Sequence, residues 1–303
     1  MPYSDLCREK ILSEDYHDFI VSDIRMPFLQ DMLEKDCCLQ NPGFFYQCAY
    51  LSKSVIKPVS LENYSYFSIP KCYSLLSMQA LNQAGILPIQ NHSTIQLSGK
   101  QVMIGFLDTG IDYQNPVFQH LDKTTRIAGI WDQTIQSGTP PESFDYGSHY
   151  TPDMINEALA SEDPYSLVPS VDNNGHGTFL ASIAAGSGDP DAQFIGAAPE
   201  SVIAVVKLKQ AKQYLRDYYF IPNTAPAFQE NDIMLGMRYL NELANRYDMP
   251  LVICIALGSN MGGHNATLPI TGLLEIYANI ANRAVVIGGG NEANQRHHFY
   301  GKS

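Results

Sequence analysis

Residues 102–112 read VMIGFLDTGID: six apolar or small residues, then Asp108 and the turn-forming pair Thr109 and Gly110. A short, continuously apolar run that ends in a turn is typical of a strand buried on both faces of a parallel sheet. In open sheets of this kind, ligands meet the carboxyl ends of the strands. The pattern therefore predicts a partly desolvated carboxylate, that of Asp108, at the sheet edge where a functional site is expected.

Three further apolar runs, with helical patterns between them, extend this sheet. Strands are predicted at residues 102–107, 202–208, 251–257 and 284–287, and helices at 152–160, 177–185, 231–247 and 272–282. Strands that alternate with amphipathic helices form a mainly parallel α/β sheet with helices on its faces. Residues 133–170 are otherwise expected to be loop.

The residues before Ser98 follow a less regular pattern and predict a small α+β unit. Its expected elements are strands at residues 18–24, 44–51 and 55–59, a helix at 27–33, a connector at 64–70 and a helix at 75–84. The connector is rich in tyrosine and has no helical period.

Composition and charge argue against several classes of function. A hydrophobic fraction of 45% with 17% charged residues is typical of a globular chain. Nineteen Lys and Arg residues against 31 Asp and Glu residues give a net charge of −12 without a basic cluster, which argues against a nucleic-acid partner. The longest apolar run, residues 251–257, is far below the roughly 20 residues that cross a bilayer, so no membrane span is expected. The N-terminus has no apolar signal segment, which favours a cytoplasmic protein.

Five of the six cysteines lie before residue 73, and their spacings do not indicate a disulfide framework. The adjacent Cys37 and Cys38 suggest a metal site, but they lack the C-x-x-C spacing of structural zinc sites. Free, partly buried thiols are therefore expected, and no metal ligands are assigned.

Two other stretches lie at predicted junctions between strands and helices. In residues 173–178, NNGHGT, glycines flank His176 at a helix start, a placement that suits a general base. In residues 288–292, GGGNE, glycines permit close backbone approach and the Asn291 amide can donate to an oxyanion. Each stretch alone has a simpler interpretation, since an Asp-Thr-Gly forms turns and glycine-rich loops turn or bind phosphate. The functional interpretation depends on the combination: the three stretches occur in this order, and each lies at a predicted junction between a strand and a helix.

Together, these stretches resemble the aspartate, histidine and oxyanion-asparagine regions of the subtilisin-like serine proteases. Residues 196–200, GAAPE, before the strand at 202–208 fit the same pattern. The resemblance covers about residues 73–303 and implies a three-layer α/β/α fold with a mainly parallel sheet, incomplete at the C-terminus. Residues 1–72 would then be a propeptide-like unit. Segments 7–16 and 130–134 are more similar to clostridial subtilases, including the Csp type linked to spore germination, which implies association with the spore.

The resemblance also implies roles for individual residues. Asp108 would orient His176, and His176 would accept the proton of a serine that attacks a peptide carbonyl. Asn291 would stabilise the oxyanion. Substrate backbone would pair with the strand at Ala256, Leu257 and Gly258, and Gly288, Gly289 and Gly290 would form the pocket wall. The expected partner is a polypeptide substrate.

The nucleophile motif of the family, Gly-Thr-Ser, does not occur in these 303 residues. In this family the serine follows the oxyanion asparagine at some distance, so we expect it beyond residue 303. The chain as given would then be inactive alone.

Other interpretations remain open at this point. A non-catalytic subtilase-like scaffold, or pseudoprotease, would bind a peptide or a protease partner. An aspartic protease would need a second Asp-Thr/Ser-Gly, which the chain lacks. No cofactor is required, and structural calcium, which the family often carries, has no D-x-D-x-D-G loop to locate it. His264 is expected in a solvated loop, and any cut that releases the N-terminal unit is expected between residues 60 and 74.

Overall fold

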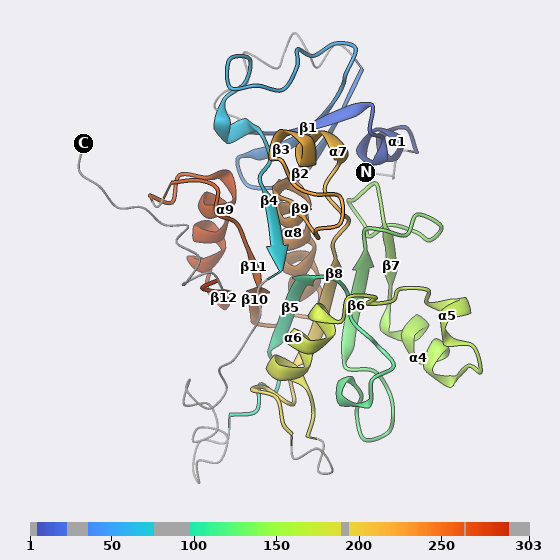
Figure 1. The fold of residues 1–303 in the computed structure, drawn as a ribbon. Helices are drawn as coiled ribbons and strands as arrows, with labels where there is room; N and C mark the ends of the chain where they lie inside the picture. The colour runs from blue at the N-terminus through green and yellow to red at the C-terminus, as the bar shows by residue number, and fades with distance from the viewer. Residues whose placement is uncertain (1–4, 23–35, 76–96, 189–193, 264, 291–303) are drawn as a thin grey trace.

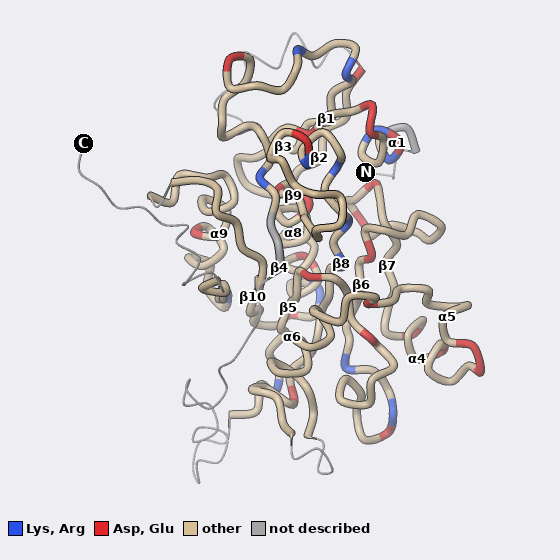
Figure 2. The backbone as a smooth tube through the Cα atoms, viewed as in Figure 1, with Lys and Arg blue, Asp and Glu red and all other residues tan. Residues whose placement is uncertain are grey.

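The computed structural model describes residues 5–22, 36–75, 97–188, 194–263 and 265–290. Two parts are visible in Figure 1: an N-terminal unit, residues 5–75, and an α/β body, residues 97–290, on which it sits. Figure 2 shows acidic and basic positions interspersed along the coloured parts of the tube. Within the described residues, no helix combines the length and apolar character that crossing a membrane requires.

The centre of the α/β body is a six-stranded sheet with the order β12-β10-β5-β8-β6-β7. All neighbouring strands in it are parallel except the edge strand β7, which is antiparallel to β6. The predicted α/β fold with a mainly parallel sheet is therefore confirmed. The six strands are β5 (Met103–Asp108), β6 (Ile127–Asp132), β7 (Ser148–Tyr150), β8 (Val202–Lys207), β10 (Leu251–Ile255) and β12 (Arg283–Ile287).

Helices cover both faces of this sheet, and side chains of β5 pack alternately against the helices on the two faces. Leu107 packs in the cluster formed with α8 (Glu230–Arg246), whereas Phe106 packs in the cluster formed with α6 (His176–Ala185). Since successive side chains point to opposite faces, a strand covered on both sides is apolar throughout. The remaining helices of the body are α4 (Pro152–Ala160), α5 (Pro164–Leu167), α7 (Gln213–Tyr218), α9 (Pro269–Ala278) and the 3₁₀ turn η3 (Pro116–Phe118).

The N-terminal unit contains an antiparallel sheet with the order β1-β3-β2. Its elements are α1 (Asp5–Leu12), β1 (Tyr16–Ser22), β2 (Cys37–Gly43), β3 (Tyr46–Ser52) and the 3₁₀ turn η2 (Tyr66–Ser68). The strand predicted at 55–59 is wrong, because that segment forms turns and irregular backbone. Five strands of the structure were not predicted from the sequence: β2, β4 (Cys72–Leu75), β6, β7 and β9 (Phe228–Gln229). The predicted helix at 27–33 lies outside the described residues, as does that at 75–84 apart from Leu75, which ends a strand.

A second, small sheet joins the two parts. Its middle strand is β4 (Cys72–Leu75), which follows the connector and lies between β9 (Phe228–Gln229) and β11 (Leu257–Gly258) of the body. Both pairings are antiparallel. Figure 1 shows β4 as the strand that descends from the N-terminal unit into the body.

A buried ionic pair fixes β1 to the body. Asp18 Oδ1 lies 2.5 Å from Lys212 Nζ, and the side chains are only 1% and 3% exposed. The second oxygen of Asp18 accepts hydrogen bonds from Gln229 Nε2 at 2.7 Å and Asn231 Nδ2 at 3.1 Å. Burial lowers the pKa of Lys212, partly offset by Asp18. The carboxylate thus has partners for both of its oxygens, as a charge without water requires.

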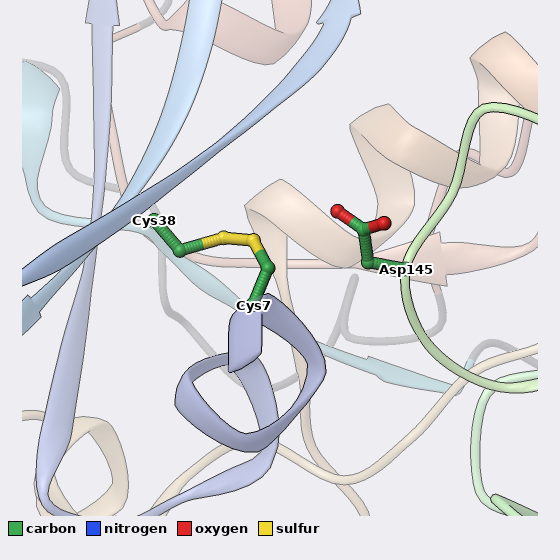
Figure 3. Close-up of side chains that lie close together, drawn as sticks. All are labelled: Cys7, Cys38 and Asp145. Atoms are coloured by element: carbon green, nitrogen blue, oxygen red, sulfur yellow. A yellow bond between two sulfur atoms is a disulfide. The ribbon is translucent and has the colours of Figure 1, made fainter. Parts of the chain in front are cut away.

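The expectation of free thiols is wrong for two cysteines. Cys7 of α1 and Cys38 of β2 form a disulfide, with their Cα atoms 5.4 Å apart (Figure 3). The pairing depends on how α1 packs against β2, and a sequence separation of 31 residues does not reveal that packing. Cys37, Cys48, Cys72 and Cys254 are not disulfide-bonded.

Candidate active site

Asp108 and His176, predicted from separate motifs, meet at the carboxyl edge of the central sheet. Asp108 is the last residue of β5 and His176 is the first residue of α6. His176 Nδ1 lies 2.8 Å from Asp108 Oδ1 and 3.0 Å from Oδ2. The Asp108 side chain is fully buried, whereas that of His176 is 14% exposed. With Nδ1–H donating to the carboxylate, Nε2 is the basic nitrogen, which is the arrangement of an oriented general base.

The turn after β5 holds the carboxylate in place. Thr109 donates to Asp108 Oδ1 from its backbone N at 2.7 Å and from its hydroxyl at 3.2 Å. The Thr109 hydroxyl in turn accepts from Gly177 N at 2.9 Å. A Cβ on Gly177 would lie 2.2 Å from Gly110 O, so only glycine allows α6 to approach the turn this closely. The glycine after His176 is therefore required for the pair to meet.

Asp172 is a positioning residue that was not predicted from the sequence. Its Oδ2 accepts from Thr178 N at 2.9 Å and Thr178 Oγ1 at 2.7 Å, and its Oδ1 accepts from Gly175 N at 2.9 Å. Thr178 Oγ1 also accepts from Asp112 N at 2.8 Å. Burial disfavours the charge of Asp172, but these hydrogen bonds hold its pKa below the usual range. An aspartate shortly before a predicted helix start is the signal that could have revealed it.

The predicted substrate strand lies beside this pair, and another strand already pairs with it. Ala256 is buried between β10 and β11, and Leu257 and Gly258 form β11. In the register of the small sheet, Leu257 faces Leu75 and Gly258 faces Ser74 of β4. Residues expected to bind substrate backbone therefore bind backbone from the N-terminal unit.

The glycines predicted to form the pocket wall follow β12 at the same edge of the sheet. Gly288 N donates to Ile255 O at 3.0 Å, which ties the start of this loop to β10. Gly289 and Gly290 are exposed, and a Cβ on either would meet no described atom within 4 Å. Asn291 lies outside the described residues, as do His264, His297 and His298.

One group of three potential metal ligands occurs among the described residues: Cys7, Cys38 and Asp145. Figure 3 shows Asp145 beside the disulfide. Sulfurs bonded to each other are not thiolates, and metal binding by cysteine needs the thiolate. Calcium prefers six to eight oxygen ligands, so this sulfur-rich group does not fit it either.

Comparison with known proteins identifies the family. The model of the subtilase family matches residues 99–300. The subtilisin-like protease SBT2.2 of Arabidopsis thaliana is 32% identical over 131 residues, which are 37% of this chain and 15% of that protein. Its relative SBT2.3 is 31% identical over 102 residues, which are 30% of this chain and 12% of that protein.

A solved structure agrees with this match. The CspB protease of Clostridium perfringens is 33% identical, with a TM-score of 0.58 over 69% of this chain and 40% of its own. The chain thus spans well under half the length of these relatives. Because the family model matches about two thirds of the residues, including Asp108 and His176, the chain belongs to the subtilase family.

Proposed function

We propose that this chain is part of a subtilisin-like serine endopeptidase, with Asp108 and His176 as two members of its catalytic triad. The observation that carries the proposal is the contact between His176 Nδ1 and both oxygens of the buried Asp108. His176 would accept the proton of the attacking serine hydroxyl and then give it to the leaving amine. Asp108 would hold the ring in the required tautomer and stabilise the imidazolium. The serine is proposed to lie beyond residue 303.

Asn291 is proposed as the oxyanion donor, on the resemblance and on its position directly after Gly288–Gly290. The hydrogen bond from Gly288 N to Ile255 O supports this role for Asn291, because it holds the start of the loop at the sheet edge that carries Asp108. A preorganised amide there would stabilise the charge that develops on the substrate carbonyl oxygen.

The N-terminal unit is proposed to act as a propeptide whose β4 lies in the substrate cleft. An extended segment that adds a strand antiparallel to two strands of the body is the recognition mode expected for a peptide substrate. β4 runs from β9 toward the carboxyl edge of β10, and β10 pairs with β5, whose last residue is Asp108. We therefore propose a cut after Leu75, at the carboxyl end of β4, as an alternative to the expected cut between residues 60 and 74.

An activity-based label tests the catalytic proposal. Full-length protein should react with a fluorophosphonate probe, and His176→Ala should abolish the reaction. A folded full-length protein that does not label, with a residue other than serine at the nucleophile position, would instead support the non-catalytic scaffold.

The processing site has its own test. N-terminal sequencing of the mature full-length protein should find a new terminus after Leu75. The variant with alanine at the nucleophile should stay uncut, and cleavage upstream of β4 would contradict the proposed role of that strand.

A further inference from the structure

Lys71, the residue immediately before β4, is a lysine without solvent exposure. Its side chain is fully buried, and Nζ donates to Tyr66 O at 2.5 Å and Ile69 O at 2.6 Å. The ammonium also lies 4.5 Å from the centre of the Tyr66 ring and 3.8 Å from Glu230 Oε2. Removing an ammonium from water costs several kcal/mol unless charge and hydrogen bonds replace the water. Both carbonyls and the ring belong to the N-terminal unit, whereas the Glu230 carboxylate belongs to the body.

Glu230 contacts both the backbone and the side chain of Lys71. Its Oε2 accepts from Lys71 N at 3.0 Å, and Glu230 N donates to Lys71 O at 2.8 Å. The other oxygen, Oε1, accepts from Ile270 N at 3.1 Å, at the start of α9. The carboxylate is fully buried, Glu230 begins α8, and the bond from Ile270 links the carboxylate to α9, so the body itself provides part of its surroundings.

The two buried charges depend on each other. Burial raises the pKa of Glu230 and lowers the pKa of Lys71, and in each case the partner opposes the shift. A neutral side chain at position 71 would leave the carboxylate without its cation, and an acidic one would add like charge in a medium with little screening. A cationic side chain at this position is the one that matches the site.

We propose that Glu230 is a specificity-determining residue, whose carboxylate selects a lysine or arginine directly before the strand that enters the cleft. The inference rests on the proposed function, since it treats β4 as a strand bound like substrate. The segment recognised is a peptide with a basic residue three positions before the residue that pairs with Gly258.

A double-mutant cycle on the 303-residue chain tests this recognition without catalysis. Hydrogen–deuterium exchange of residues 72–75 is measured in wild type, Lys71→Met, Glu230→Gln and the double variant. Each single variant should speed exchange about tenfold, and the double variant should exchange no faster than the worse single one, because both remove the same pair. Additive effects would overturn the proposal.

Two further variants keep the result decisive. Lys71→Arg should retain most of the protection, and Glu142→Gln, which alters an exposed carboxylate, should change nothing. If Glu230→Gln fails to fold, equal exchange in Lys71→Arg and Lys71→Met overturns the proposal by itself.

Cleavage in the full-length protein provides the second arm. Peptides that copy residues 68–80 and differ only at position 71 should rank Lys and Arg about tenfold above Met in kcat/KM, with Glu lowest. Glu230→Gln should remove most of this ranking. A protein that labels with the fluorophosphonate but cuts all four peptides equally would refute the specificity. A protein that neither labels nor cuts would refute the proposed function, while the exchange cycle still reports on the contact.

Discussion

Two buried carboxylates, each paired with a side-chain nitrogen at a similar distance, perform different tasks in this molecule. Asp108 and His176 lie 2.8 Å apart at the edge of the central sheet, where the histidine is partly open to solvent. Asp18 and Lys212 lie 2.5 Å apart between β1 and the body, where both are sealed from water. The charged partner of Asp18 has no route to a reactant, so that pair can only hold the two parts together. Catalysis requires a pair in which one side chain can contact a substrate, and of the two pairs only Asp108–His176 has such a side chain.

Removing the charge of the open pair should cost activity rather than stability. In the full-length protein, Asp108→Asn should lower kcat about 10⁴-fold, a magnitude taken from characterised triad enzymes, because the asparagine favours the wrong histidine tautomer. Peptide hydrolysis measures the rate, and thermal unfolding of the same variant is the control. A variant that keeps full activity would break the assignment of this pair.

Removing the charge of the sealed pair should cost stability instead. Asp18→Ala leaves the Lys212 ammonium buried without its carboxylate and should lower the free energy of unfolding by about 3–5 kcal/mol. Urea denaturation of the 303-residue chain measures the change. Asp15→Asn is the matched control, because Asp15 is 86% exposed and lies 3.7 Å from Lys53, so its loss should cost under about 0.5 kcal/mol. Equal losses of unfolding free energy in Asp18→Ala and Asp15→Asn would contradict the structural role of the buried pair.

The disulfide restrains the same N-terminal unit covalently. Cys7→Ser should lower the free energy of unfolding by about 3 kcal/mol, because the crosslink no longer limits the unfolded chain. Cys37→Ser, at the neighbouring residue outside the disulfide, is the control and should cost less. Thiol titration of the denatured wild type under non-reducing conditions should find four thiols, and six would disprove the pairing.

The smallest expected effect is a loss of stability in mild acid. Burial lowers the pKa of His17 to about 4, below its ordinary 6.5, and its ring stacks on Tyr214 of the body with centroids 3.9 Å apart. Between pH 6.5 and 4, His17 is protonated in the unfolded chain but stays neutral in the folded chain. The free energy of unfolding therefore decreases as the pH falls from about 6.5 toward 4. His17→Phe should flatten this part of the curve of unfolding free energy against pH. His149, whose pKa burial also lowers to about 4, should keep part of the slope in that variant.

The central strands and the motifs at their ends were predictable because the forces that define them are local. The run before Asp108 is apolar throughout, so it predicts a buried strand, which the structure contains as β5. The helix predicted at 152–160 is α4, which has those bounds and begins with Pro152 directly after the capping Thr151. By contrast, β2 contains Asn41 and Pro42 and lacks an apolar run, and its pairing with β3 decides its conformation.

The sequence by itself determined the family, the parallel sheet and the candidate pair Asp108 and His176, since glycines, turns and apolar periods are short-range signals. Only the tertiary structure decided that Cys7 bonds Cys38, that Asp18 meets Lys212 and that β4 lies between β9 and β11. Each of these contacts joins residues 31 or more positions apart. Such contacts depend on how whole elements pack, because packing, and not local pattern, sets which distant residues meet.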